Sequence, residues 1–448
     1  MSDAVSGIGA WLQQAQWPTK TSSSKPVSGT GTPATATAAS AAAATTPLAQ
    51  GAGVMMSTPF QQATSDLRNL LLALQHWVPG GSPLTIDGQG QTASMGDHST
   101  AIVNGSNNKV AIGNCSTATV NGNYNTVGVG QLSTATIGGN YNTIYAGGGS
   151  TVTAGGNYNS IYAGGLSTVT VGGHDNAIVG DNYTTINMTG DNNSTTAGEG
   201  ITTHISGNND SITCGWASTA TLSGESDSLS TGGNANVTVD GSKCSVTMVD
   251  NFHNVSVSGT ENNILFGGGT VANISGNKNN IASTNQFDSD IEISGSNNSF
   301  ESGGGGIGKI NVTGNNNNIG ANSGDCVTVS GQGNKINMTG GMCSSLTVSG
   351  QDNTIDTGHN GKVVISGSQN VVQIHPAWGS PTDAQTLISG ANNTINCGSG
   401  STLTVSGANN TINANNCTIT LADGVEANIV GQNNTIIRLP PEQTKGAA

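Results

Sequence analysis

The phrases Gly139-Asn-Tyr-Asn-Thr-Ile144 and Gly314-Asn-Asn-Asn-Asn-Ile319 are two copies of the six-residue unit that decides the fold. Twenty copies follow one another from Gly88 onward, each opened by glycine. The sixth residue of a copy is here called its closing residue. Its sequence number rises by 17 from copy to copy over the first ten copies and by 17 to 24 thereafter, the last copy closing at Ile436. A short, constant period predicts a stack of similar coils with insertions on some turns.

Apolar and polar residues alternate inside each copy, as in Thr168-Val-Thr-Val171, which is the pattern of a strand with one buried face. The closing residue and the residue two places later, such as Ile144 and Ala146, form one expected inward pair. The ninth and seventh residues before the closing residue form the other, as in Val169/Val171, Val255/Val257, Ile291/Ile293, Ile310/Val312, Val327/Val329 and Leu403/Val405. We therefore expect an all-β fold: a parallel β-solenoid of about twenty short coils with two facing sheets, over residues 84–439.

Glycine and asparagine hold fixed places in the turn before the closing residue. Glycine tolerates positive φ, so the chain is expected to reverse there. Asparagine stands two places before the closing residue in 16 of the 20 copies. Stacked coils would bring these amides to about 4.8 Å from one another, where they can hydrogen-bond along the stack as a ladder. The predicted ladder includes Asn125, Asn142, Asn159, Asn353 and Asn410.

The chain outside the repeats changes in composition. Residues 1–20 are a short N-terminal segment, residues 21–58 an Ala/Thr/Ser/Pro tract expected to be a disordered linker, and residues 440–448 a tail. In residues 59–80, apolar side chains fall on one helical stripe that Pro79-Gly80-Gly81 ends; they are Phe60, Leu67, Leu70, Leu71, Leu74 and Trp77. This predicts a helix that caps the first coil, with a docking or export element as the alternative.

The charge balance narrows the class of partner. The net charge is −14, only 8% of residues are charged, and the chain has no basic stripe to neutralise phosphates, so we expect no nucleic-acid partner. We also expect no membrane insertion, because no apolar run approaches transmembrane length. No Sec-type signal peptide is recognisable. The Gly/Asn/Ser/Thr-rich composition favours an extracellular or cell-surface location reached by a non-Sec route, with the cytoplasm as the alternative.

No residue set suggests catalysis, a cofactor or a metal site, and we expect the protein not to be an enzyme. The densest acidic group, Asp288, Asp290 and Glu292, is expected to solvate one strand, with cation binding as the alternative. The seven cysteines lack zinc-site spacing. Cys214 and Cys397 are expected in the core. Cys326 and Cys343 are one repeat step apart, so adjacent coils would bring them near disulfide range.

Two outward features are candidates for binding. Threonine recurs in outward columns, as in Thr134/Thr136 and Thr151/Thr153, an array that resembles the ice-binding face of antifreeze solenoids; exposed strand residues are the simpler interpretation. Tyrosine forms two columns that could stack on sugar rings or on a neighbouring molecule, or could be internal turn ladders. The first column is Tyr124, Tyr141 and Tyr158, and the second is Tyr145 and Tyr162.

The unit from Ser150 to Ile161, with its Ser-led strand, Gly-Asn turn and second strand, resembles the repeats of curli-type amyloid subunits of bacterial biofilms. Curli repeats are longer and carry internal Gln positions that are mostly missing here. Bactofilin-type cytoskeletal solenoids are also similar in coil length. These resemblances imply a structural repeat protein: a fibre, matrix or surface subunit whose partner is itself, by head-to-tail or lateral association.

Three other functions stay open: a glycan-binding or ice-binding module, a polysaccharide-active enzyme, and a cytoskeletal filament. The two ends of the predicted solenoid differ, since the expected helix covers the first coil while Pro440-Pro441 covers little of the last strand edge. This predicts head-to-tail association that strengthens when residues 1–80 are removed.

Overall fold

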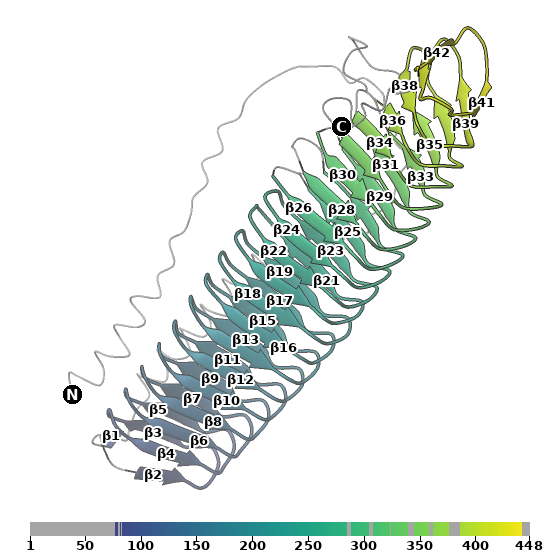
Figure 1. Ribbon diagram of the computed structural model, residues 1–448. Helices are drawn as coiled ribbons and strands as arrows, with labels where there is room; N and C mark the ends of the chain where they lie inside the picture. The colour runs from purple at the N-terminus through teal and green to yellow at the C-terminus, as the bar shows by residue number, and fades with distance from the viewer. Residues whose placement is uncertain are drawn as a thin grey trace, which may run out of the picture. The chain divides into compact units, whose positions relative to one another are not determined.

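The computed structural model describes residues 77–78, 81, 83–284, 288–303, 308–322, 324–338, 345–357, 362–375 and 386–440. The chain divides into two compact units, residues 1–152 and 153–448, which are described separately. Each unit consists of short parallel strands in two sheets (Figure 1): odd-numbered strands form sheet A and even-numbered strands form sheet B. The predicted all-β solenoid class is therefore confirmed for the described residues, which contain no helix.

The first unit contains the first nine strands. Sheet A consists of β1 (Trp77–Val78), β3 (Thr92–Met95), β5 (Lys109–Ile112), β7 (Thr126–Val129) and β9 (Thr143–Ala146). Sheet B consists of β2 (Pro83–Ile86), β4 (Thr100–Val103), β6 (Thr117–Val120) and β8 (Thr134–Ile137). Strand β10 (Thr151–Ala154) crosses the division between the units.

The second unit repeats the same arrangement, with one strand of each sheet per coil. Sheet A consists of β11 (Ser160–Ala163), β13 (Ala177–Gly180), β15 (Ser194–Ala197), β17 (Ser211–Cys214), β19 (Ser228–Thr231), β21 (Ser245–Met248), β23 (Asn263–Phe266), β25 (Asn280–Ser283), β27 (Ser299–Glu301), β29 (Asn318–Ala321), β31 (Lys335–Met338), β33 (Thr354–Asp356), β35 (Val371–Ile374), β37 (Thr394–Cys397), β39 (Asn410–Ala414) and β41 (Ala427–Val430). Sheet B consists of β12 (Thr168–Val171), β14 (Thr185–Met188), β16 (Thr202–Ile205), β18 (Thr219–Leu222), β20 (Asn236–Val239), β22 (Asn254–Val257), β24 (Val271–Ile274), β26 (Asp290–Ile293), β28 (Lys309–Val312), β30 (Cys326–Val329), β32 (Ser345–Val348), β34 (Lys362–Ile365), β36 (Thr386–Ile388), β38 (Thr402–Val405), β40 (Thr418–Leu421) and β42 (Thr435–Arg438).

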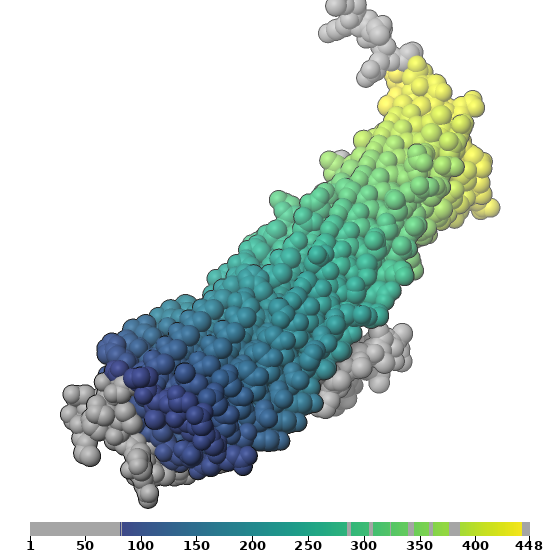
Figure 2. Space-filling model, turned by 90° about the horizontal axis from the view of Figure 1, so that it is seen from below, coloured from purple at the N-terminus to yellow at the C-terminus, as the bar shows by residue number. Residues whose placement is uncertain are grey.

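The register follows the repeat. Ile161 pairs with Ile178, and Val372 pairs with Ile395 across a longer interval of sequence, so the extra residues of the longer coil lie outside the strands. The predicted inward pairs are buried in every example given above. These aliphatic side chains fill a thin core between the two sheets, and the face of the second unit seen in Figure 2 has no deep hollow.

The last copy departs from the predicted column. Ile412 of β39 pairs with Ile429 of β41 in sheet A, whereas Ile436 lies in β42 and pairs with Ile419 in sheet B. The long interval from Ile412 to Ile436 is therefore not one coil with an insertion. It is one regular coil, which ends at Ile429, plus the stretch that carries the chain to the opposite sheet, so the assignment of Ile436 to the same column was wrong.

The reason predicted for the turn glycine was also wrong. Across the stack the positive-φ position is mostly the residue two places later, such as Tyr124 at 59° or Asn192 at 59°, while Gly122 is absent from the positive-φ residues. Glycine is required because successive turns pack backbone to backbone. A Cβ atom on Gly122 would lie 1.8 Å from the carbonyl oxygen of Gly105 in the preceding coil.

The predicted capping helix lies almost entirely outside the described residues. Its last two residues, Trp77 and Val78, form strand β1, which pairs in parallel with Ser94 and Met95 of β3. The helix prediction was wrong at these two positions, where the chain already belongs to sheet A. In the described part of the chain, no helix is long and apolar enough to span a membrane.

Candidate functional site

The asparagine column ties each coil to the one before it. The backbone N–H of Asn108 donates to Oδ1 of Asn125 at 2.9 Å, and Nδ2 of Asn125 donates to the carbonyl oxygen of Gly105, also at 2.9 Å. Asn410 does the same with the N–H of Asn393 and the carbonyl of Gly390, both at 2.8 Å. Asn125 and Asn410 thus each form a two-point clip that satisfies one donor and one acceptor of the preceding coil. Asn193 differs, because its Nδ2 donates to the carbonyl oxygen of Gly190 in its own turn at 2.7 Å.

This geometry corrects the predicted amide-to-amide ladder. Most contacts along the column join a side chain to the backbone, because the preceding turn presents its own N–H and C=O groups to the amide. Oδ1 of Asn142 accepts from the N–H of Asn125 at 2.8 Å, and the N–H of Asn159 donates to Oδ1 of Asn176 at 2.8 Å. Direct amide-to-amide bonds are added at a few places, for example from Asn353 to Asn370 at 3.0 Å.

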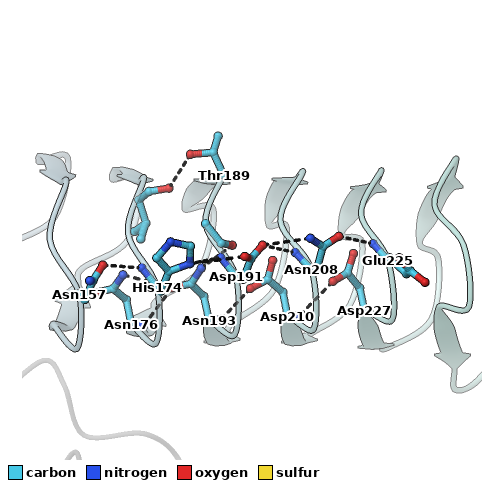
Figure 3. Close-up of polar contacts among 12 residues, drawn as sticks. Asn157, His174, Asn176, Thr189, Asp191, Asn193, Asn208, Asp210, Glu225 and Asp227 are labelled. Atoms are coloured by element: carbon cyan, nitrogen blue, oxygen red, sulfur yellow. Dashed lines mark hydrogen bonds and ion pairs between the residues drawn. The ribbon is translucent and has the colours of Figure 1, made fainter.

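A second column, the outer column, consists of the residues that directly follow the turn glycines (Figure 3). Here the bonds run in the opposite direction along the chain. The Asn157 side chain accepts from the N–H of His174 at 2.9 Å, and Oδ1 of Asp191 accepts from the N–H of Asn208 at 2.9 Å. Every turn in this region is therefore held to both neighbouring coils, by the inner clip to the coil before it and by the outer column to the coil after it.

The His174 imidazole is a link in the outer column. Its Nδ1 accepts the N–H of Asp191 at 3.0 Å, which places the ring proton on Nε2. Oδ2 of Asp191 lies 3.6 Å from the same nitrogen, but an ion pair there would need a proton on Nδ1 and would break the backbone bond. Because both side chains are exposed, we assign the pair a positioning role in the turn and no proton-transfer role.

Two aspartates occupy the inner column in place of asparagine: Asp210 and Asp227, two places before the closing residues Ile212 and Leu229. Oδ1 of Asp210 accepts from the N–H of Asn193 at 2.6 Å, and Oδ1 of Asp227 from the N–H of Asp210 at 2.9 Å. Burial raises the pKa of each carboxyl from 3.8 to about 6. Neither residue was predicted to be part of a site, although an alignment of the copies shows both as acidic residues in an asparagine column.

The first tyrosine column lies at exposed, left-handed backbone positions. Tyr124 and Tyr141 have φ of 59° and 57°, and their rings stack with centroids 4.9 Å apart and an interplanar angle of 7°. Tyr158 has the same backbone conformation and is also exposed. A bulky residue at positive φ is uncommon, and asparagine is the more usual occupant of this turn position.

The second tyrosine column is less accessible. Tyr145 is 5% exposed and Tyr162 is partly buried, so the Tyr145 ring does not offer a face to a ligand in this structure. Contact between this column and a ligand or partner remains a prediction, and the burial of the Tyr145 side chain does not support it.

Other large apolar side chains lie on the opposite turn edge of the second unit, which the sequence analysis did not single out. Leu166, Tyr183 and Phe252 are well exposed and have φ of 61° to 68°. A Cβ on Gly200 would lie 2.5 Å from Cδ1 of Tyr183, and one on Gly269 would lie 2.6 Å from Cδ1 of Phe252. Each ring therefore lies over a glycine of the following coil, a pairing that an aromatic residue followed one repeat later by glycine could have signalled.

The remaining candidates have simple surroundings. Asp288, Asp290 and Glu292 are exposed, and Asp290 pairs in register with Lys309 of the next strand, which fits a solvated strand. The threonine columns are in register and outward, with Thr100, Thr117 and Thr134 side by side in the first unit. Among the described residues, no group of three or more His, Cys, Asp or Glu is placed to hold a metal ion.

The cysteine predictions have mixed outcomes. Cys214 is buried, which raises the pKa of its thiol to about 12, whereas Cys397 is only partly buried. The in-register partner of Cys326 in the next coil is Ser345, two residues after Cys343, so the expected alignment of Cys326 with Cys343 by one repeat step was wrong. Cys343 lies outside the described residues, so the proposed bridge between Cys326 and Cys343 remains a prediction.

Comparison with known families adds a partial match. One family model, described as a protein of unknown function (DUF3060), matches residues 103–157 and 329–382. The two matched segments each span about three coils and carry the Gly-Asn phrase of the repeat, so the match follows the solenoid unit. No curated protein and no solved structure matches the chain.

Proposed function

We propose that this protein is a non-catalytic structural subunit that associates with copies of itself, as part of a fibre, a matrix or a cell surface. The repetitive β-solenoid, with polar groups satisfied by inner and outer columns, supports a structural role because its stability depends on contacts between neighbouring coils. An extracellular or cell-surface location is part of the proposal.

The observation that carries the proposal is the exposed strand edge of the last described coil. Ile436 in β42 is 49% exposed, whereas Ile419, its partner in β40, is fully buried. Val430, Ile437 and Leu439 are exposed beside it. Strands β41 and β42 each pair on one side only in the described residues, so unpaired backbone groups and apolar side chains lie together, as in sheet edges that accept another chain.

Light scattering coupled to size-exclusion chromatography, followed by negative-stain microscopy, tests the proposal. The wild-type protein should give species larger than the 44.5 kDa chain as its concentration rises. Ile436→Asp should abolish them, because a carboxylate on the exposed edge cannot be buried against a second chain. Val271→Asp is the matched control, since Val271 is similarly exposed on strand β24 away from this edge. A wild-type protein that stays monomeric at high concentration would reject self-association.

Glycan binding is the second candidate function, and the Tyr124–Tyr141 stack favours it. The two rings are large, aromatic and exposed, and such side chains can stack on the apolar faces of sugar rings. The rings cover one face of each other, so a sugar would contact the other face of Tyr124 or the hydroxyl edges. Tyr124→Asn with Tyr141→Asn should reduce retention on insoluble polysaccharide; retention equal to that of wild type would remove this candidate.

A further inference from the structure

Asp210 and Asp227 are buried carboxylic groups in adjacent coils of the second unit, each 1% exposed. Their Oδ1 atoms accept backbone N–H groups as asparagine does at this place (Figure 3). Their Oδ2 atoms are buried and have no hydrogen-bond partner. An unpaired polar atom inside a tightly packed column is costly, so its environment has to be explained.

The asparagines of the same column show what the second atom normally does. Nδ2 of Asn334 donates to the carbonyl oxygen of Gly314 at 2.9 Å. A Cβ built on Gly331, which opens the same turn, would lie 2.9 Å from this nitrogen and 1.8 Å from that carbonyl oxygen. The position of this constructed Cβ atom therefore marks the place where the amide nitrogen approaches the carbonyl oxygen of the preceding coil.

The same construction at the aspartates finds an oxygen in that place. A Cβ on Gly207 would lie 2.6 Å from Oδ2 of Asp210 and 1.9 Å from the carbonyl oxygen of Gly190. A Cβ on Gly224 would lie 2.6 Å from Oδ2 of Asp227 and 1.5 Å from the carbonyl oxygen of Gly207. A carboxylate oxygen and a carbonyl oxygen are both acceptors, so only a proton between them makes a hydrogen bond.

The charged neighbours do not remove this conflict. Asp191 and His174 lie near Asp210 on the outer column, and Asp210 and Asp191 add negative charge near Asp227. Hydrogen-bond donors, including the Asn193 side chain at Asp210 and the Gly224 backbone at Asp227, lower the two pKa values, but the effect of burial is larger. The exposed side chains of Glu225 and Lys243 form an ion pair, so their charges cancel. The next residue of the inner column after Asp227 is Cys244. The one basic group that acts on Asp210 is the exposed His174, whose Nδ1 already accepts a backbone N–H.

We propose that Asp210 and Asp227 form a proton-operated latch in the stack. Protonated, each carboxylic acid donates its Oδ2–H to the glycine carbonyl of the preceding coil and replaces the missing amide. Deprotonated, each sets an anionic oxygen against that carbonyl and loosens the coils between residues 190 and 227. Because burial raises the pKa of both carboxyls above 3.8, their stabilisation is complete below about pH 3.8 and is lost as the pH rises through about 6.

Thermal unfolding of the full chain, followed by circular dichroism between pH 4 and pH 7.5, tests the latch. The wild-type melting temperature should fall as the pH rises through 6. The double variant Asp210→Asn with Asp227→Asn should match wild type near pH 4, melt at a higher temperature at pH 7.5, and lose most of this pH dependence. Asp175→Asn is the control, because Asp175 is an exposed residue of the same turn edge and should behave as wild type.

An infrared difference spectrum between wild type and the double variant at pH 5 gives an independent readout, in which the absorption of protonated carboxyl groups should disappear in the variant. The latch is overturned if wild type and the double variant have the same pH dependence, or if no such absorption is lost.

Discussion

Replacing Asn353 by leucine tests the inner column directly. Asn353 is fully buried; its Oδ1 accepts the N–H of Asn334 at 2.7 Å, and its Nδ2 donates to the carbonyl of Gly331 at 3.0 Å. Leucine has a similar volume but leaves that N–H and that carbonyl unsatisfied inside the stack. At about 1–3 kcal/mol for each buried unpaired group, the expected loss is about 2–6 kcal/mol, reduced by about 1 kcal/mol for the added apolar burial.

Hydrogen exchange resolved to single amides is the most direct assay, because it reports on the coil that holds the changed side chain. The Asn334 amide should lose protection together with its neighbouring coils in Asn353→Leu. Asn311→Leu is the matched control: Asn311 faces solvent on strand β28, and its replacement should change stability by less than about 0.5 kcal/mol. Unchanged protection of Asn334 in Asn353→Leu would refute the clip.

Three further outcomes are expected. Gly314→Ala should destabilise the second unit by about 3 kcal/mol or more, because its Cβ would lie 1.8 Å from the Gly295 carbonyl oxygen; a denaturation midpoint equal to that of wild type would contradict the close packing. Tyr124→Asn with Tyr141→Asn should leave the melting temperature unchanged or raise it, since asparagine tolerates positive φ better; a large fall would mean that the stack is structural. Asn353→Asp should create a further latch, because burial should raise the pKa of the new carboxyl as it does for Asp210 and Asp227; the variant should be more stable in acid than at neutral pH, and a pH profile parallel to wild type would count against this.

Much of the fold could be predicted because the sequence repeats at a nearly constant interval. Alternating residues such as Val169 and Val171 must face one side of a strand, and a constant repeat step must bring equivalent residues side by side. The distances between backbones of neighbouring coils cannot be derived from this repeat pattern. The sequence shows that glycine recurs, but only the structure shows that Gly122 is excluded from having a side chain by a carbonyl oxygen of the preceding coil.

The candidate site was predicted less completely. Asparagine recurs at one position of the repeat, so the column could be predicted. The partners of its hydrogen bonds could not, because they depend on which backbone groups the preceding turn leaves unpaired. The importance of Asp210 follows from one atom, Oδ2, which lies where asparagines such as Asn262, Asn279 and Asn334 have a donor to the preceding glycine carbonyl. The exposure of Ile436 depends on its being in sheet B of the last coil, and spacing alone assigned it to the other sheet.

The bonds of the inner and outer columns reach one coil away in either direction, and this has a consequence for how such a chain changes over generations. If one copy is lost or duplicated within a run of equal copies, the flanking coils meet the same carbonyl and N–H groups as before. The packing between the remaining coils does not have to change. The length of the molecule is then free to vary by slippage and recombination in the gene, in steps of one copy, while the surface of each remaining coil is preserved.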